Sequence, residues 1–250
     1  MTTNFYAPPS TIRSGRVVLP DRESQHVRTV LRGERGDEMT VVDGEGGWYR
    51  VEITHLAPEQ VVGTILERRE GIGEPVVDVT VGIGILKKRS RFETFVEKAV
   101  ELGVGRIVPL RTRRTEPESV REERLRNVMV AAMKQCRRSR LPALAAPRSL
   151  ADVVATEAEL GLVCHAGEEA VPIRQTIDER GPVQSALVLV GPEGGFAPGE
   201  VEGAVAAGCT PVSLGARRLR AETAGLAALS AIAAASDGRG EGQAPPPRLS

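Results

Sequence analysis

Cysteine and aromatic residues are scarce in this chain of 250 residues, which holds three cysteines and 3% Phe, Trp and Tyr. Cys136, Cys164 and Cys209 lie far apart, with no Cys-x-x-Cys pair and no Cys/His cluster at metal-ligand spacing. The sequence therefore predicts three buried thiols, and neither a metal site nor a disulfide framework.

Long apolar runs are also lacking. No run approaches the ~20 residues that span a bilayer, and residues 1–10 lack the basic, apolar and small-residue order of a secretory signal. We therefore expect a cytoplasmic protein. The apolar share of 41% and the charged share of 26% are ordinary for a globular chain, and the length suits one large domain or a medium domain plus a small one.

Net charge is zero, but the charges are unevenly distributed. Residues 86–140 hold sixteen Lys and Arg against seven Glu, an excess of nine positive charges that the rest of the chain balances. Such asymmetry is typical of a surface that faces a polyanion. The alternative is a set of solvated helix faces with internal ion pairs.

The first part of the chain has the pattern of a small β-barrel. A helix is expected at residues 22–30, and the segment 71–75, with two glycines and a proline, is expected to be a linker. Runs of β-branched and alternating apolar residues, typical of short strands, occur at 16–19, 38–42, 48–53 and 61–66.

After residue 75, strand and helix patterns alternate, which predicts an α/β domain with a mostly parallel sheet covered on both faces. Strands are expected at 77–85, 107–110, 162–164, 186–190 and 211–214. Helices are expected at 92–102, 125–136, 198–207 and 221–235. Residues 236–250 are rich in Gly, Pro and polar residues, and we expect a disordered tail there.

Two glycine-containing loops follow predicted strands and precede predicted helices. The first is Gly191-Pro192-Glu193-Gly194-Gly195-Phe196. It lacks the GxxxxGK[ST] and GxGxxG patterns of phosphate loops. Ligands of open α/β sheets bind beyond the carboxyl ends of strands, so this loop is a candidate binding site; the alternative is a tight turn.

The second loop is Leu214-Gly215-Ala216-Arg217-Arg218-Leu219-Arg220, followed by Ala221-Glu222-Thr223-Ala224. Glu222 and Thr223 fall in the first helical turn, where acidic and hydroxyl side chains suit unpaired N–H groups. This loop alone could be a charged helix cap. Two such loops after successive strands instead indicate one shared pocket.

GPEGGF followed by LG-x-R-x-LR-x-ETA resembles the ribosomal RNA small subunit methyltransferase E family of the SPOUT superfamily. The resemblance covers residues 5–235 and includes Lys98-x-x-Glu101-Leu102-Gly103-Val104, Pro109 with Arg114, Gln135-Cys136-Arg137-Arg138 with Pro142, and His26 to Arg32 followed by Gly36-Asp37 and Asp43-Gly44. Three positions depart from the family pattern, namely Arg218 where an apolar residue is usual, Lys134 where Glu is frequent, and Ala221 where Thr is frequent.

The resemblance implies a PUA-like β-barrel over residues 1–72 and a SPOUT methyltransferase domain with a C-terminal trefoil knot over residues 76–235. It further implies a homodimer without metal that transfers the methyl group of S-adenosylmethionine to N3 of a uridine in 16S ribosomal RNA, the RNA being presented within the assembled small subunit. Nothing in the sequence indicates which uridine is modified.

The resemblance also implies site residues. The cofactor would contact Gly191, Glu193, Gly194, Gly195, Leu214, Gly215, Leu219, Arg220 and Thr223. N3 of uracil is a poor nucleophile until its proton leaves, so the reaction needs a base or cations that stabilise the uracil anion. Arg220 and Arg138 are the candidate cations and Glu222 the candidate proton acceptor. RNA would be bound by Lys87, Lys88, Arg89, Arg91, Arg114, Arg138, His26 and Arg32.

Two further residues have alternative roles, and a third residue has none. Glu101 could accept a proton, but an ion-pair role is favoured. His165 follows a strand on the side of the expected pocket and could line it. Arg218 has no assigned role.

Two other functions remain open from the residues alone. One is an RNA-binding assembly factor without enzymatic activity, against which the intact GPEGG and LR-x-ETA segments argue. The other is a nucleotide-dependent enzyme acting on a small molecule, against which the missing phosphate-loop lysine and the basic middle region argue.

Overall fold

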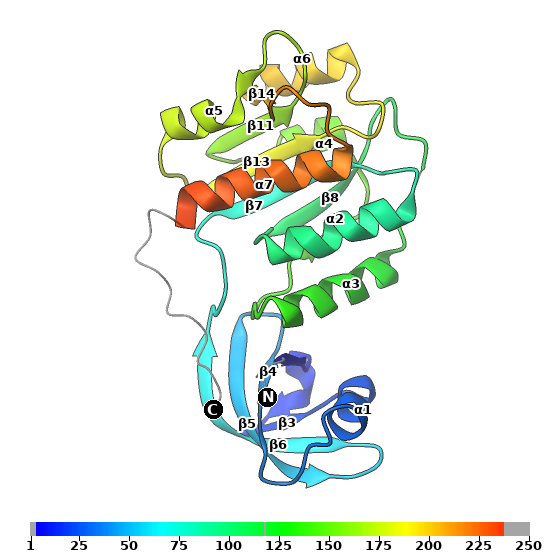
Figure 1. The fold of residues 1–250 in the computed structure, drawn as a ribbon, viewed down its shortest axis with the longest axis vertical. Coiled ribbons are helices and arrows are strands. Elements are labelled where there is room, and N and C mark those ends of the chain that lie inside the picture. Colours follow the sequence, from blue (N-terminus) through cyan, green and yellow to red (C-terminus); the bar gives the residue numbers. More distant parts are fainter. Residues whose placement is uncertain (1–3, 118, 238–250) are drawn as a thin grey trace. The chain divides into compact units, whose positions relative to one another are not determined.

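A computed structural model describes residues 4–117 and 119–237, and contacts within the chain divide it into two compact units (Figure 1). The first unit holds residues 4–74 and also 130–141, and the second holds the remaining described residues. The sequence pattern places residues 130–141 with the second domain, because the helical period of the residues before them continues to residue 136. Their contacts place them in the first unit, so one helix belongs to both.

The first unit contains a curled, six-stranded sheet with the strand order β1-β4-β5-β6-β3-β2 (Figure 1). Its helices are η1 (Pro9–Thr11), which is a 3-10 helix, and α1 (Asp21–Thr29). Its strands are β1 (Asn4–Tyr6), β2 (Ile12–Arg13), β3 (Arg16–Val18), β4 (Glu38–Val42), β5 (Gly47–Leu56) and β6 (Val61–Glu70). The four predicted strands and the predicted helix are confirmed.

The curl of this sheet has a local cause in the long hairpin of β5 and β6. Their antiparallel register shifts between Arg50 and Val51 and again between Ile53 and His55. Such irregularities bend a strand and increase its twist. The sheet therefore wraps around its apolar face in the manner of a half-barrel.

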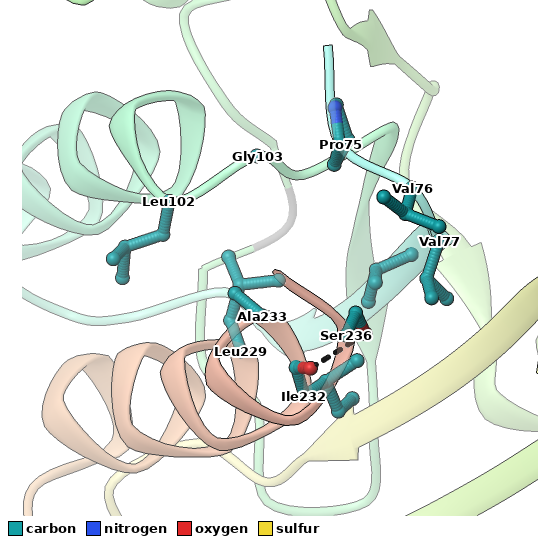
Figure 2. A pocket seen from close by; sticks show the side chains of 10 residues that line it. Pro75, Val76, Val77, Leu102, Gly103, Leu229, Ile232, Ala233 and Ser236 are labelled. Atoms are coloured by element: carbon teal, nitrogen blue, oxygen red, sulfur yellow. Dashed lines mark hydrogen bonds between the residues drawn. The ribbon is translucent and has the colours of Figure 1, made fainter. Parts of the chain in front are cut away.

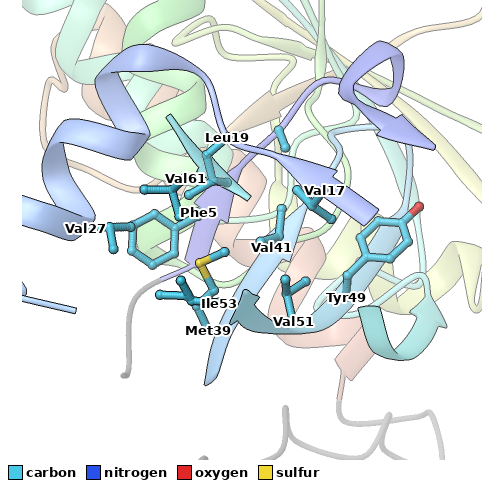
Figure 3. Close-up of a cluster of buried hydrophobic side chains, with 11 residues drawn as sticks. Phe5, Val17, Leu19, Val27, Met39, Val41, Tyr49, Val51, Ile53 and Val61 are labelled. Carbon is cyan, nitrogen blue, oxygen red and sulfur yellow. The ribbon is translucent and has the colours of Figure 1, made fainter. Parts of the chain in front are cut away.

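The apolar face of the curled sheet forms the core of the first unit (Figure 3). Val51 and Ile53 of β5 are fully buried and point to the same face, as the two-residue period of a strand requires. Val27 of α1 packs into the same cluster beside Phe5. Burying each such side chain contributes roughly 1.5–3 kcal/mol, and this packing stabilises the sheet.

The second unit is built on an eight-stranded sheet in which every strand pair is parallel. The main path has the order β10-β8-β7-β13-β11-β14-β12, and β9 pairs with β8. The strands are β7 (Asp78–Gly84), β8 (Arg106–Arg111), β9 (Ala143–Leu144), β10 (Arg148–Ser149), β11 (Leu160–Cys164), β12 (Val171–Pro172), β13 (Ser185–Val190) and β14 (Thr210–Ser213). The predicted parallel sheet and its five predicted strands are confirmed.

Strand β13 is buried on both of its sides, because helices cover both faces of this sheet. Leu187 and Leu189 pack with Val153 of α4 and Val201 of α6, while alternate residues such as Val188 face the opposite side. The helices α2 and α7 pack together there, and Gly225 brings α7 close to the ring of Phe95. The helices are α2 (Arg89–Glu101), α3 (Glu122–Gln135), α4 (Leu150–Val154), α5 (Ile173–Arg180), α6 (Pro198–Ala206) and α7 (Ala221–Asp237).

The four helices predicted for this part are confirmed as α2, α3, α6 and α7. Helix α7 continues to Asp237, two residues beyond its predicted end. The expected disordered tail lies, from residue 238 onward, outside the described residues. Within residues 4–117 and 119–237, no helix combines the length and the apolar composition needed to cross a bilayer.

Candidate functional site

The carboxyl ends of neighbouring parallel strands meet at one edge of the second unit's sheet. Val190, the last residue of β13, is in register with Ile83 of β7 on one side and with Cys164 of β11 on the other. Cys164 is in turn in register with Val212 of β14. The loops that follow these strands therefore start side by side, where α/β proteins bind ligands.

The loop after β13 is tightly folded. The N–H of Gly195 donates to the carbonyl of Pro192 (2.8 Å), and Gly195 has a φ of 70°, a conformation that favours glycine. At Gly191, a Cβ atom would lie 2.7 Å from the backbone nitrogen of Phe196. The first position of the loop can therefore carry no side chain without displacing its own backbone, and the loop presents backbone groups at the sheet edge.

Neighbouring loops hold this glycine loop in place. The Glu193 carboxylate accepts a hydrogen bond from the N–H of Lys87, which follows β7 (3.1 Å). The Arg114 guanidinium, from the connection after β8, donates to the carbonyl of Gly194 (2.7 Å). Where the loop enters α6, Glu200 accepts from the N–H of Ala197 (2.8 Å) and through its other oxygen from the N–H of Arg113 (2.8 Å).

The loop after β14 leads directly into α7. Gly215 is exposed and has a φ of 106°, and its N–H donates to the hydroxyl of Ser213 (3.3 Å). Leu214 and Leu219 are half-buried, whereas Arg220 is exposed. The loop thus combines an accessible backbone with two partly covered apolar side chains.

Glu222 is the unusual residue of this edge. It is only 9% exposed, and its Oε1 lies 3.7 Å from Nε of Arg91 on α2. Its Oε2 is buried and has no hydrogen-bond partner among the described residues. Leaving a buried polar atom unpaired costs about 1–3 kcal/mol, more for a charged group. A ligand or an ordered water can supply the partner that this carboxylate oxygen lacks among the described residues.

The structure brings all the predicted cofactor residues to this edge, in the loops after β13 and β14 and the first turn of α7. Gly194 and Thr223 are exposed, and Glu193 is half-buried. The contacts of these residues with a cofactor stay predictions.

Five of the predicted RNA-binding residues also belong to the second unit. Lys87, Lys88 and Arg89 are exposed where α2 begins. Lys87 pairs with Glu116 (2.6 Å), and the hydrogen bond that the lysine donates to that carboxylate raises the pKa of the lysine. Arg91 and Arg114 instead lie against the site itself, through Glu222 and Gly194.

The other three predicted RNA-binding residues belong to the first unit. Arg32 is exposed, and the half-buried His26 has its ring 6.0 Å from that of Phe5. Arg138 is only 3% exposed, and its guanidinium donates to Glu74 from Nη2 (2.9 Å) and Nε (3.2 Å). Its roles in RNA binding and catalysis stay predictions. Either role requires the guanidinium to give up its hydrogen bonds to Glu74.

Two residues with alternative roles have protein partners. Glu101 accepts from Lys98 (2.8 Å), and the hydrogen bonds that Lys98 donates to Glu101 and Glu97 raise the pKa of that lysine. His165 follows β11 and has Nε2 3.4 Å from the Glu169 carboxylate. These contacts agree with an ion-pair role for Glu101.

Several contacts of the site were missed by sequence reasoning. Glu200 lies three residues after Ala197, the spacing of a capping glutamate, so its contact with the Ala197 N–H could have been found. The contact between Arg114 and Gly194 joins residues 80 apart in the sequence, and that between Arg91 and Glu222 joins two helices. No local pattern signals such pairs.

A small apolar hollow lies elsewhere in the second unit and is not a ligand site (Figure 2). It is lined by side chains from the start of β7 and the ends of α2 and α7, including Val77, Leu102 and Ile232. Its volume of about 10 Å³ holds at most one water molecule. The described residues also contain no group of three His, Cys, Asp or Glu side chains arranged to hold a metal ion.

Comparison with known proteins defines the class. Residues 73–233 match the family model of the RNA methyltransferase domain, and residues 19–66 match that of the RNA methyltransferase PUA domain. The fold is thus that of an RNA methyltransferase that carries a PUA domain.

Curated relatives narrow the class. The chain is 32% identical to the ribosomal RNA small subunit methyltransferase E of Synechocystis sp. over 93% of its length and 77% of the relative's. It is 30% identical to the protein of the same name from Mycobacterium tuberculosis, over 91% and 90% of the two lengths. The chain therefore belongs to the ribosomal RNA small subunit methyltransferase E family.

Solved structures agree with this assignment. A probable rRNA-methyltransferase from Porphyromonas gingivalis matches 94% of this chain and 99% of its own, with 31% identity and a TM-score of 0.86. A ribosomal RNA small subunit methyltransferase E from Neisseria gonorrhoeae, bound to S-adenosyl methionine, matches 93% and 97% with 27% identity and a TM-score of 0.82.

Proposed function

We propose that this protein transfers the methyl group of S-adenosylmethionine to N3 of a uridine in 16S ribosomal RNA. The observation that carries the proposal is the meeting of two glycine-containing loops at one sheet edge in a chain of this family. We assign RNA recognition to residues 1–72 and methyl transfer to residues 76–235.

The loops fit the cofactor that the Neisseria relative is described as binding. Gly194 and Gly215 are exposed and present backbone groups without side chains. Leu214 and Leu219 are half-buried and offer apolar surface to an adenine ring. The backbone of Gly191 and Gly195 completes the cradle, and Glu193, Arg220 and Thr223 supply polar side chains.

A trefoil knot belongs to the same proposal. The chain leaves β14, which lies beyond β11, and α7 then packs against β13 and β7 on the other side of β11. The segment 214–220, part of the cofactor cradle, makes this return. Its path supports the threading expected of a SPOUT domain, and we propose that the cofactor binds on the threaded segment.

The reaction needs a group that accepts the proton of uracil N3. S-adenosylmethionine supplies an electrophilic methyl group on sulfur, so the protein mainly aligns and deprotonates the acceptor. When the N3–carbon bond forms and the carbon–sulfur bond breaks, the N3 proton must leave. We assign its acceptance to Glu222, whose Oε2 has no partner in the described part of the chain, and stabilisation of the developing uracil anion to Arg220.

Arg138 is a second proposed cation that stabilises the uracil anion. For this role its guanidinium must release the Glu74 carboxylate and donate to the uracil instead. RNA phosphates would be held by the exposed Lys87, Lys88, Arg89 and Arg32, with His26 contacting RNA in the first unit. We also propose that the protein works as a homodimer, without metal, on the assembled small subunit.

The test is tritium transfer from labelled S-adenosylmethionine to small ribosomal subunits that lack their native uridine methylation. Label recovered as 3-methyluridine supports reaction and substrate together. Arg220→Ala and Glu222→Gln should each lower kcat by about 100-fold, the effect expected for lost proton transfer or anion stabilisation. Arg218→Ala, which removes the same charge from the same loop, is the matched control.

Two negative results have different meanings. Cofactor binding without transfer to subunits or free ribosomal RNA would leave the fold assignment and overturn the substrate. Absence of cofactor binding would overturn the methyltransferase proposal and favour an RNA-binding assembly factor.

A further inference from the structure

We infer that Arg114 is a positioning residue that sets the conformation of the glycine loop, and thereby the affinity for the cofactor, rather than a phosphate contact. This inference rests on the proposed function. It reassigns a residue whose place in the basic region and in the family pattern favoured RNA binding.

The first argument is the contact of the Arg114 side chain with Gly194. Nη1 of Arg114 lies 2.7 Å from the carbonyl oxygen of Gly194, a short distance typical of a charge-assisted hydrogen bond. The stem of the same side chain covers the glycine, because a Cβ built on Gly194 would lie 3.5 Å from Cβ and 3.4 Å from Cδ of Arg114. Head group and stem therefore both act on one residue of the loop.

The second argument is that the connection after β8 is folded to present Arg114. The Thr112 and Thr115 hydroxyls lie 2.9 Å apart, and the Thr115 hydroxyl also accepts from the N–H of Thr112 (3.0 Å). The Thr112 hydroxyl accepts from the N–H of Arg114 (3.3 Å). This turn fixes the backbone from which the arginine side chain extends.

The third argument is that hydrogen bonds from the neighbouring residues Arg113 and Lys87 also hold the segment that contains the glycine loop. The N–H of Arg113 donates to Glu200, which caps the helix that follows the glycine loop. The N–H of Lys87 donates to Glu193 on the other side of the loop. With Gly194 held by Arg114, three successive parts of one segment are fixed, at residues 193, 194 and 197–200.

A glycine loop held in this way presents its backbone groups in one arrangement before the ligand arrives. Such preorganisation lowers the entropic cost of binding. Losing the Arg114 contact frees the loop without removing any group that touches the ligand. The effect belongs to the cofactor dissociation constant and not to the RNA.

The experiment compares Arg114→Ala, Arg114→Lys and the control Arg121→Ala by calorimetric titration with S-adenosylmethionine, with thermal unfolding measured for each. Arg121 lies in the same connection, and no hydrogen bond or ion pair of its side chain occurs within the described residues. We expect Kd to rise about tenfold in Arg114→Ala, which corresponds to about 1.4 kcal/mol. Arg114→Lys should recover part of the loss, since an ammonium can still donate to the carbonyl, and Arg121→Ala should stay within twofold.

A second measurement separates positioning from phosphate contact. RNA affinity is measured against salt concentration for the wild-type chain and Arg114→Ala, together with KM for each substrate. Positioning predicts an unchanged salt slope, a raised KM for S-adenosylmethionine and an unchanged KM for RNA. An unchanged cofactor Kd with a salt slope reduced by about one unit would overturn the inference and return Arg114 to the phosphate contacts.

The two proposals fail in different ways. A wild-type chain that does not bind S-adenosylmethionine overturns the proposed function and this inference with it. A wild-type chain that binds, with Arg114→Ala binding equally well, overturns the inference alone.

Discussion

Replacing Glu74 by glutamine should strongly destabilise the first unit. The Glu74 carboxylate receives hydrogen bonds from Nε and Nη2 of Arg138 through one oxygen and from the N–H groups of Ser139 and Arg140 through the other. Its side chain is 13% exposed and that of Arg138 is 3% exposed. This carboxylate therefore joins residue 74 to the segment 130–141 and balances a buried positive charge.

The size of the effect follows from which bonds are lost. The amide oxygen of a glutamine can still accept from the backbone N–H groups of Ser139 and Arg140, so those bonds survive. The amide nitrogen would face the Arg138 guanidinium with donors against donors, and the pair would lose the negative charge of Glu74. Breaking a buried pair from one side typically costs 3–5 kcal/mol, and the slight exposure of Glu74 favours the lower end, about 3 kcal/mol.

The assay is urea unfolding followed by the fluorescence of Trp48, the only tryptophan, which lies in the first unit. With a typical slope of about 1–3 kcal/mol per molar urea, the midpoint should fall by about 1–3 M. Glu70→Gln is the matched control, because Glu70 is in the same unit and its pair with Arg68 is exposed; pairs of that kind contribute little.

Two outcomes would refute this reasoning. One is a midpoint for Glu74→Gln that equals that of Glu70→Gln. The other is a double variant, Glu74→Leu with Arg138→Met, that is less stable than either single replacement, because removing both charges together should relieve the penalty. Unfolding measurements are also needed to interpret Arg138→Ala. A loss of activity in that variant supports a catalytic role for Arg138 only if the variant remains folded.

Three further predictions concern the buried Tyr49 and Glu23 and the half-buried Cys164, whose thiol the sequence predicted to be buried. Burial and, to a smaller extent, the hydrogen bond to Asp43 raise the pKa of Tyr49 to about 12, whereas an unfolded tyrosine titrates near 10. Because the folded state holds this proton more tightly, the free energy of unfolding should fall as the pH rises from about 10 to 12. Urea titrations of Tyr49→Phe should lack this fall. Lys134→Ala should lower the urea midpoint by leaving Glu23 buried and unpaired, at a cost of about 1–3 kcal/mol, and the exchange Glu23→Lys with Lys134→Glu should recover most of it. Burial raises the pKa of the Cys164 thiol to about 12, so iodoacetamide should modify Cys164 in the unfolded chain, as mass spectrometry would show, and scarcely in the native one.

Elements with a long apolar period were predictable from the sequence, and short ones were not. The run from 186 to 190 and the helix ending in the Ala-rich segment 221–235 carry enough residues to show their period. Strands β2, β9, β10 and β12 have two residues each, too few for any alternation. Helix α5 buries only Ile173 and Ile177, so its apolar pattern is too sparse to distinguish it from a loop.

The candidate site divides in the same way. Its two loops were predictable because each follows an apolar strand and contains glycines, and parallel strands bring their carboxyl ends to one edge. The contacts that fix the loops were not, because no local pattern shows that Arg114 reaches Gly194 or that Glu193 reaches the N–H of Lys87. Membership of residues 130–141 in the first unit was hidden too, since helix α3 keeps one apolar period while its contacts change from one unit to the other.

The division of α3 between the two units has a consequence for the order in which the chain can fold during its synthesis. Glu74 is translated 64 residues before Arg138. At about 5–20 residues per second, the first unit waits roughly 3–13 seconds for the segment that neutralises this carboxylate, and in that time the start of the second unit has already been made. The N-terminal unit is thus first to be translated but cannot be first to be completed, and a nascent chain stalled before residue 138 should hold its curled sheet without its closing ion pair.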